Sequence, residues 1–99
     1  MHIPPRCEDW AEHEWAEIRR LETFCAGIEH WSVECDHTDV GDPWCIIYDQ
    51  QLHRIVLHIA RIDRRYVVVW PGESRSAETP SITAAVEMAM ERLRGYAKA

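Results

Sequence analysis

The stretch that most constrains the fold is residues 44–70, WCIIYDQQLHRIVLHIARIDRRYVVVW. It holds three apolar runs that are rich in β-branched and aromatic residues, Trp44–Tyr48, Ile55–Ile62 and Tyr66–Trp70. The polar breaks between them, 49–51 and 63–65, are short enough to be hairpin turns. The sequence therefore predicts three consecutive antiparallel strands.

Side chains alternate between the two faces of a strand, so each run divides into two sets. Trp44 and Tyr48 share one face of the first run, and Tyr66 and Trp70 share one face of the third. Neither set in any run is clearly polar, whereas a free-standing antiparallel sheet normally exposes one face to water. We therefore expect either that both faces are covered or that one face binds a partner.

The flanking segments predict a helix on each side of the sheet. After an irregular lead-in over residues 1–7, a helix is expected from Glu8 or Asp9 to Gly27. Its apolar stripe consists of Trp10, Trp15, Ile18, Leu21, Phe24, Cys25 and Ile28. Residues 30–36 alternate as a half-exposed strand, and a loop follows over 36–43. Residues 71–79 read as a linker to a second helix with Thr79 as its N-cap and Pro80 at its first position.

These elements predict an α+β fold in the order α-β-β-β-β-α. The economical arrangement is a two-layer sandwich, a four-stranded antiparallel meander with both helices on one face, forming a single domain over residues 1–99. The other face is then expected to expose aromatic side chains, namely Trp44, Tyr48, Tyr66 and Trp70.

Composition limits the class of protein. With 46% hydrophobic and 28% charged residues in a chain of 99, disordered and fibrous classes are excluded. No apolar run approaches the roughly 20 residues that span a bilayer, and the N-terminus has no secretion signal. A cytoplasmic protein is expected. The net charge of −6 is concentrated in residues 1–42 and argues against general binding to nucleic-acid phosphates.

The aromatic face supports the leading functional hypothesis, a non-enzymatic protein that forms a homodimer or binds a protein partner through this face. Burial of the face within the chain, or its use as a ligand groove, are the alternatives.

The loop before Trp44 gives a second hypothesis, because Asp36, Asp39 and Asp42 cluster there around His37. Carboxylates beside a histidine can orient or activate it, so a small-molecule site or an enzyme centred on residues 36–42 is an alternative. Aspartate-rich loops are more often turn formers, and the chain contains no nucleophile elbow or glycine-rich phosphate loop. An enzyme is therefore not the preferred interpretation, and no cofactor is expected.

Metal binding has weak support. The possible ligands are Cys35, His37, Cys45, His30, His53 and His58. No C-x2-C or H-x3-H pair occurs, so a metal site is not expected. The four cysteines (Cys7, Cys25, Cys35, Cys45) are expected to be free thiols, because no secretion signal accompanies them.

Arginines at the second and third runs suggest a further alternative, nucleic-acid binding through Arg54, Arg61, Arg64 and Arg65. The helix–sheet–helix order is similar to that of the double-stranded-RNA-binding domain, a family that uses a Lys-rich start to its last helix to hold phosphates. Here the corresponding segment, residues 79–83, is TPSIT and has no lysine. We therefore do not expect nucleic-acid binding.

A second resemblance covers roughly residues 41–70. Asp42-Pro43-Trp44, followed by Ala60-Arg61-Ile62-Asp63 and Tyr66-Val67, is similar to small bacterial proteins with a D-P-W … A-R-I-D-x-x-Y-V pattern. The resemblance implies a bacterial, cytoplasmic protein and no particular activity.

Overall fold

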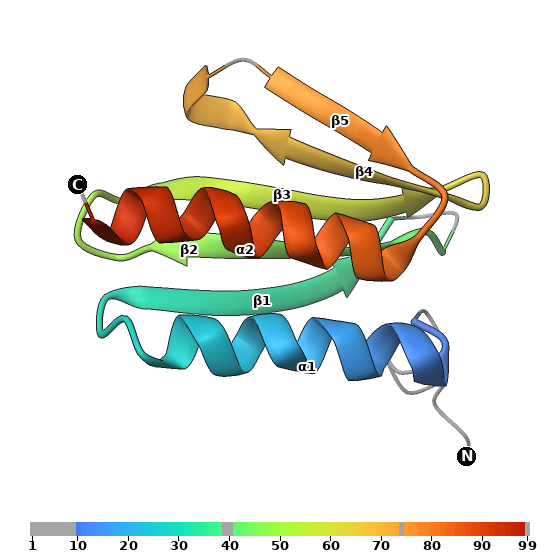
Figure 1. Ribbon diagram of the computed structural model, residues 1–99, viewed down its shortest axis with the longest axis horizontal. Coiled ribbons are helices and arrows are strands. Elements are labelled where there is room, and N and C mark those ends of the chain that lie inside the picture. The colour runs from blue at the N-terminus through green and yellow to red at the C-terminus, as the bar shows by residue number, and fades with distance from the viewer. Residues whose placement is uncertain (1–9, 39–40, 74, 99) are drawn as a thin grey trace.

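The structure is a computed structural model that describes residues 10–38, 41–73 and 75–98. The elements follow the order α1 (Glu12–Ala26), β1 (Trp31–His37), β2 (Pro43–Asp49), β3 (Arg54–Ile62), β4 (Arg65–Trp70), β5 (Arg75–Thr79) and α2 (Ile82–Lys98). The five strands form one antiparallel sheet in the order β1-β2-β3-β4-β5 (Figure 1). The α+β class predicted from the sequence is confirmed.

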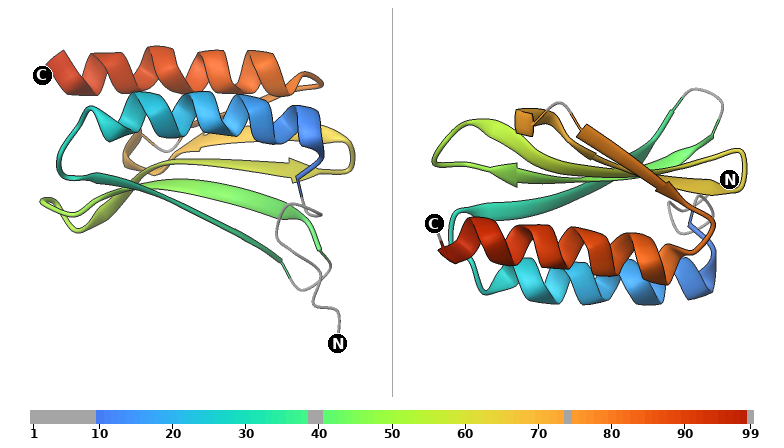
Figure 2. Two further views of the ribbon diagram at one scale, coloured as in Figure 1. Left: turned by 90° about the horizontal axis from the view of Figure 1, so that it is seen from below. Right: turned by 45° about the horizontal axis from the view of Figure 1, so that its top comes forward.

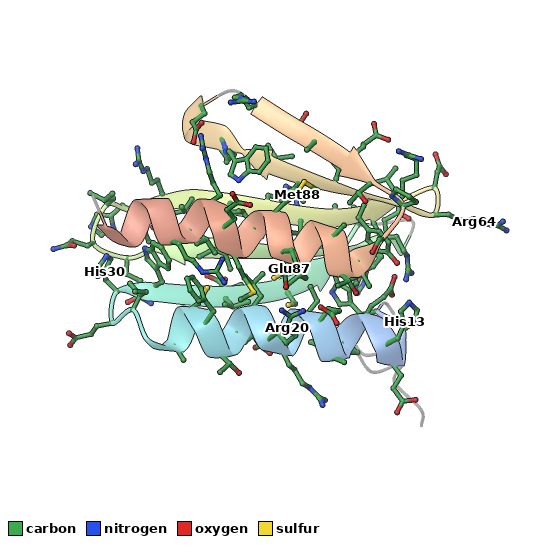
Figure 3. The ribbon with its side chains drawn as sticks, in the orientation of Figure 1. His13, Arg20, His30, Arg64, Glu87 and Met88 are labelled. Carbon is green, nitrogen blue, oxygen red and sulfur yellow. The ribbon has the colours of Figure 1, made fainter. Side chains whose placement is uncertain are left out.

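Both helices lie on the same side of the sheet, which leaves the opposite side without a helix (Figure 2, left). The core between the two layers is apolar. Its fully buried members include Ile18 and Leu21 of α1, Leu57 of β3, and Val86 and Leu93 of α2. The two helices also contact each other, and an Arg20–Glu87 ion pair joins them on the surface (Figure 3).

The predicted four-stranded sheet is wrong in strand number, because residues 75–79 form a fifth strand and not a linker. Trp70 pairs with Arg75 and Tyr66 pairs with Thr79, while a short 3-10 turn at 71–73 reverses the chain. The segment RSAET forms a strand because its backbone completes the hydrogen bonding of one side of β4, although its side chains are mostly exposed.

Both helices begin later than predicted. In α1, the carboxylate of Glu14 accepts a hydrogen bond from the Ala11 backbone N–H at 2.6 Å, so the first turn is closed at residues 11–14. In α2 the N-cap is Ser81 and not Thr79, since the Ser81 hydroxyl accepts from the Ala84 N–H at 3.1 Å. Thr79 belongs to β5. The predicted end of α1 before Gly27 is confirmed.

The two central turns fix the register of the sheet. Asp63 and Arg64 both have positive φ (50° and 65°) and form the two-residue turn between β3 and β4. Between β2 and β3 the register shifts at Ile47/Tyr48, which is a bulge. The buried Asp49 carboxylate holds this second turn by accepting from the N–H groups of Gln51 and Leu52 at 2.9 Å each.

Candidate functional site: the uncovered face of the sheet

The side of the sheet opposite the helices is apolar over its three central strands. The pairing places Trp44 opposite Ala60 and Ala60 opposite Val67, and it places Ile46 opposite His58 and His58 opposite Val69. We call this surface the open face. Its members are Trp44, Ile46, Tyr48, His58, Ala60, Ile62, Val67 and Val69. All are half-buried except Ile62, which is 46% exposed.

Near the centre of the open face, the ring of Trp44 contacts the ring of His58 edge-on. The ring centroids are 6.1 Å apart with an interplanar angle of 83°. Burial lowers the pKa of His58, because the protonated imidazole loses hydration there. The face therefore holds a histidine whose environment favours the neutral form.

The rims of the open face are polar. On β1, Glu34 lies opposite Ile46 and Asp36 lies opposite Trp44, which makes this edge acidic. On the other side, Arg65 of β4 forms an ion pair with Glu78 of β5 at 2.7 Å. An apolar centre with charged rims is the composition of a protein-binding surface.

The predicted aromatic set does not share one face. Trp44 and Tyr48 are on the open face, whereas Tyr66 and Trp70 are on the face that the helices cover, so that half of the prediction is wrong. The reason is the two-residue turn after β3, which pairs Tyr66 with Arg61 on the covered side. Tyr66 is buried, and the guanidinium of Arg92 from α2 lies 5.7 Å from the centroid of the Trp70 ring.

On the covered face, Glu14, Arg61 and Tyr66 form a buried polar cluster that the sequence analysis missed. The Glu14 carboxylate accepts from the Ala11 N–H, the Tyr66 hydroxyl and the Arg61 guanidinium. Burial alone would raise the pKa of Glu14, but these hydrogen bonds outweigh it and the pKa is lowered. Burial and the bond to Glu14 raise the pKa of Tyr66 to about 12.

The cluster joins α1 to the sheet through two buried side chains, Glu14 and Tyr66, so we assign it a structural role. A signal for it was present in the sequence. Glu14 stands four residues after Trp10 and four before Ile18, which places a carboxylate within the buried stripe of α1.

In the described part of the aspartate loop, the hydrogen bonds of Asp36, Thr38 and Asp42 are local. The backbone N–H of His37 donates to Asp36 at 2.8 Å, and Thr38 is bonded to Asp42 and Gly41 in a tight turn. His37 is exposed, with its Nδ1 3.5 Å from Asp36. Asp39 lies outside the described residues. The contacts seen here are those of a turn, in line with the alternative interpretation of this loop.

The four arginines of the nucleic-acid hypothesis do not form one patch. Arg61 is directed to Glu14 on the covered face, while Arg65 is paired with Glu78 on the open side. Arg54 stands at the opposite end of β3 from the turn that carries Arg64. Arg54 is therefore about 25 Å along the strand from Arg64, too far for the four arginines to bind phosphates as one cluster.

Among the described residues, no three His, Cys, Asp or Glu side chains converge so as to hold a metal ion. Cys35 lies beside Cys45, whereas His30 and His37 are at opposite ends of β1. No disulfide links Cys25, Cys35 and Cys45 to one another, in agreement with the prediction; Cys7 lies outside the described residues.

A cavity of about 320 Å³ lies between α2 and the β4–β5 hairpin. It is lined by Trp70, Arg75, Met88, Glu91, Arg92 and Gly95. Within the described part of the chain, the Trp70 indole N–H has no hydrogen-bond partner, and Arg92 is paired with Glu73. The described lining carries both signs of charge, with Glu91 against Arg75 and Arg92.

No helix in the described ranges is long and apolar enough to cross a membrane. No protein-family model, curated protein or solved structure matches the chain. The case for a function therefore rests on the geometry of the open face.

Proposed function

We propose that this chain is a non-enzymatic bacterial protein of the cytoplasm that self-associates as a dimer through the open face. The observation that carries the proposal is the set of apolar side chains from β2, β3 and β4 that remains partly exposed in the monomer. Contiguous exposed apolar surfaces on folded monomers are characteristic of binding sites. Free thiols are in keeping with a reducing compartment.

Charge placement favours a second copy of the chain as the occupant. Asp36 lies near the end of β1, and the turn with Arg64 and Arg65 lies at the same end of the sheet (Figures 1 and 3). A two-fold axis parallel to the strands sets β1 of one copy over the β4–β5 side of the other. The acidic rim of each copy then faces the side of its partner that carries Arg64 and Arg65, while the apolar centres meet.

The size of the face sets the expected affinity. Three strands at about 4.8 Å spacing and six residues of about 3.3 Å give an apolar area roughly 15 Å by 20 Å. The resulting area of about 300 Å² is well below the roughly 800 Å² that each partner buries in an interface of standard size. We therefore expect a reversible dimer with a dissociation constant in the micromolar range.

The test is a charged substitution at the most exposed member of the face, Ile62→Asp. A carboxylate pressed between two apolar sheets would lose its hydration, so we expect the dimer dissociation constant to rise at least about tenfold. Sedimentation velocity over a concentration series measures this change. Circular dichroism should show an unchanged fold, because Ile62 is already 46% exposed in the monomer.

Leu52→Asp is the matched control. Leu52 is an exposed apolar residue, 56% accessible, but it lies in the turn between β2 and β3 and outside the open face. The dissociation constant of this variant should equal that of the wild type. A wild-type protein that stays monomeric at high concentration, or an equal effect of both substitutions, would refute the proposed dimer.

A further inference from the structure

Three cysteines meet between α1 and the sheet, on the face opposite the proposed interface. Cys25 comes from α1, Cys35 from β1 and Cys45 from β2. Cys35 and Cys45 are direct partners in the β1–β2 ladder. Cys25 and Cys45 are buried, whereas Cys35 is half-buried. The nearest route from solvent to the pair therefore leads to Cys35.

Cys35 and Cys45 occupy the kind of paired position in the antiparallel β1–β2 ladder at which side chains come closest together. Gln50 donates to the His30 carbonyl and Thr38 donates to the Asp42 carbonyl, each at 2.8 Å, which marks 30/50 and 38/42 as hydrogen-bonded pairs. Hydrogen-bonded and non-hydrogen-bonded pairs alternate along an antiparallel ladder, so Cys35 and Cys45 form a non-hydrogen-bonded pair.

In such a pair the Cα atoms are about 4.5 Å apart and the side chains point to the same face. Disulfides span Cα separations of about 4.4 to 6.8 Å, so the backbone already has a compatible spacing. The two thiols are also hydrogen-bonded to each other.

We propose that Cys35 and Cys45 are a thiol–disulfide modification site, closed by a low-molecular-weight disulfide such as oxidised glutathione. The Cys35 thiolate attacks one sulfur of the oxidant, forms a mixed disulfide and releases one glutathione thiol. The Cys45 sulfur then attacks the Cys35 sulfur, forms the cross-strand disulfide and releases the second glutathione thiol with the remaining proton. Two protein thiols are oxidised and one disulfide of the oxidant is reduced to two thiols.

The environments of the three thiols indicate which cysteine attacks the oxidant first and which closes the disulfide. The hydrogen bond with Cys35, together with burial, holds the pKa of Cys45 well above that of a free thiol. Burial and the nearby Glu22 carboxylate raise the pKa of Cys25 to about 12. Neither buried thiol readily forms the attacking thiolate, so the half-buried Cys35 reacts first and Cys45 resolves the mixed disulfide.

Cys25 is the competing thiol. It lines a cavity of about 320 Å³ at the surface between α1 and β1, together with Glu22, Ala26, Trp31 and Val33. It belongs to a helix and has no ladder partner, so its backbone is not fixed opposite either of the other two cysteines. We therefore expect the disulfide to link Cys35 to Cys45 and not to involve Cys25.

The experiment treats the native full-length protein with oxidised glutathione, blocks remaining thiols with N-ethylmaleimide and measures the intact mass and the peptide map. The expected product has lost two hydrogen atoms and contains a Cys35–Cys45 cross-linked peptide. A Cys25→Ser variant should give the same product in the same yield. Cys35→Ser and Cys45→Ala should each abolish it, with retained circular dichroism showing that these variants are folded.

Two results would overturn the site. One is stable glutathionylation of Cys35 without closure to Cys45, and the other is a disulfide that includes Cys25 or Cys7 in the native protein. The readout is independent of the proposed dimer, because the three thiols lie under α1 and not on the open face.

Discussion

At the scale of single residues, the buried carboxylate of Glu14 makes the clearest contribution to stability. We predict that Glu14→Ala lowers the free energy of unfolding by about 2–4 kcal/mol, because it removes the carboxylate to which Arg61 and the buried Tyr66 hydroxyl both donate. Urea denaturation followed by circular dichroism measures the change. Glu12→Ala, an exposed acidic residue in the same first turn, is the matched control and should change stability by no more than about 0.5 kcal/mol.

The same residue predicts a pH dependence. The pKa of Glu14 is lower in the folded protein than in the unfolded chain, where an ordinary glutamate titrates near about 4.3. Its stabilising effect is therefore fully present above about pH 4.3 and is lost as the pH falls through the folded-state pKa. The stability difference between the wild type and Glu14→Ala should shrink in acid, and a difference that stays constant down to pH 3 would contradict this assignment.

At the scale of elements, the turn between β3 and β4 holds a residue, Arg64, in an unfavourable backbone conformation that a substitution can relieve. Arg64 has a φ of 65°, and a residue with a Cβ pays about 1 kcal/mol or more in the left-handed region. We predict that Arg64→Gly stabilises the protein by about 0.5 kcal/mol, since the relief exceeds the entropy that glycine adds to the unfolded chain. The side chain projects into solvent, so no packing is lost (Figure 3).

The control for this change is Arg54→Gly. Arg54 is also exposed but has an ordinary strand conformation at the start of β3, so glycine should destabilise the protein there. Thermal unfolding of both variants gives the comparison. If the two substitutions lower the melting temperature equally, the turn carries no relievable strain.

The sequence predicted the elements whose signal is local and missed those that depend on pairing. The apolar stripes of α1 and α2 and the runs of β2, β3 and β4 are confirmed, because burial imposes their periodicity directly. β5 was missed since an edge strand with exposed side chains needs only backbone pairing and carries no apolar alternation.

The same distinction explains the mixed outcome at the site. Within each strand the alternation of side chains was predictable, but which sets share a face across strands depends on the turns. The residues Asp63 and Arg64 adopt a two-residue turn without the usual Asn-Gly sequence, and the bulge at Tyr48 leaves no trace in the sequence. Trp44 was therefore placed together with Tyr66 and Trp70, which lie on the other side of the sheet.

At the scale of the whole molecule, the two faces of the sheet have separate roles. The covered face holds the core, the Glu14 cluster and the three thiols, whereas the open face presents apolar side chains to solvent. The two helices cover one side of the five-stranded sheet, and no described segment of the chain packs over the other side. Association of two copies removes that exposed surface from water without a third layer in the chain.

This arrangement predicts that dimerisation depends on pH through His58. Burial already lowers the pKa of His58 in the monomer, and contact with a second sheet would lower it further. The dimer is then favoured where the His58 imidazole of the monomer is neutral, and it weakens as the pH falls through the lowered pKa of His58 in the monomer. Lowering the pH from about 7.5 through the range below about 6.5 should raise the dissociation constant, and sedimentation velocity at each pH measures the change.

The charged side chains on the open side of the sheet include Glu34 and Asp36 on β1, Arg65 on β4 and Glu78 on β5, whereas the lowered pKa of His58 comes from burial. His58→Leu should keep the dimer and remove the pH dependence, because the apolar side chain needs no proton release on contact. His13→Gln, on the exposed side of α1, should leave the pH dependence unchanged (Figure 3). If His58→Leu dissociates in acid as the wild type does, the pH dependence arises elsewhere and His58 is not at the interface.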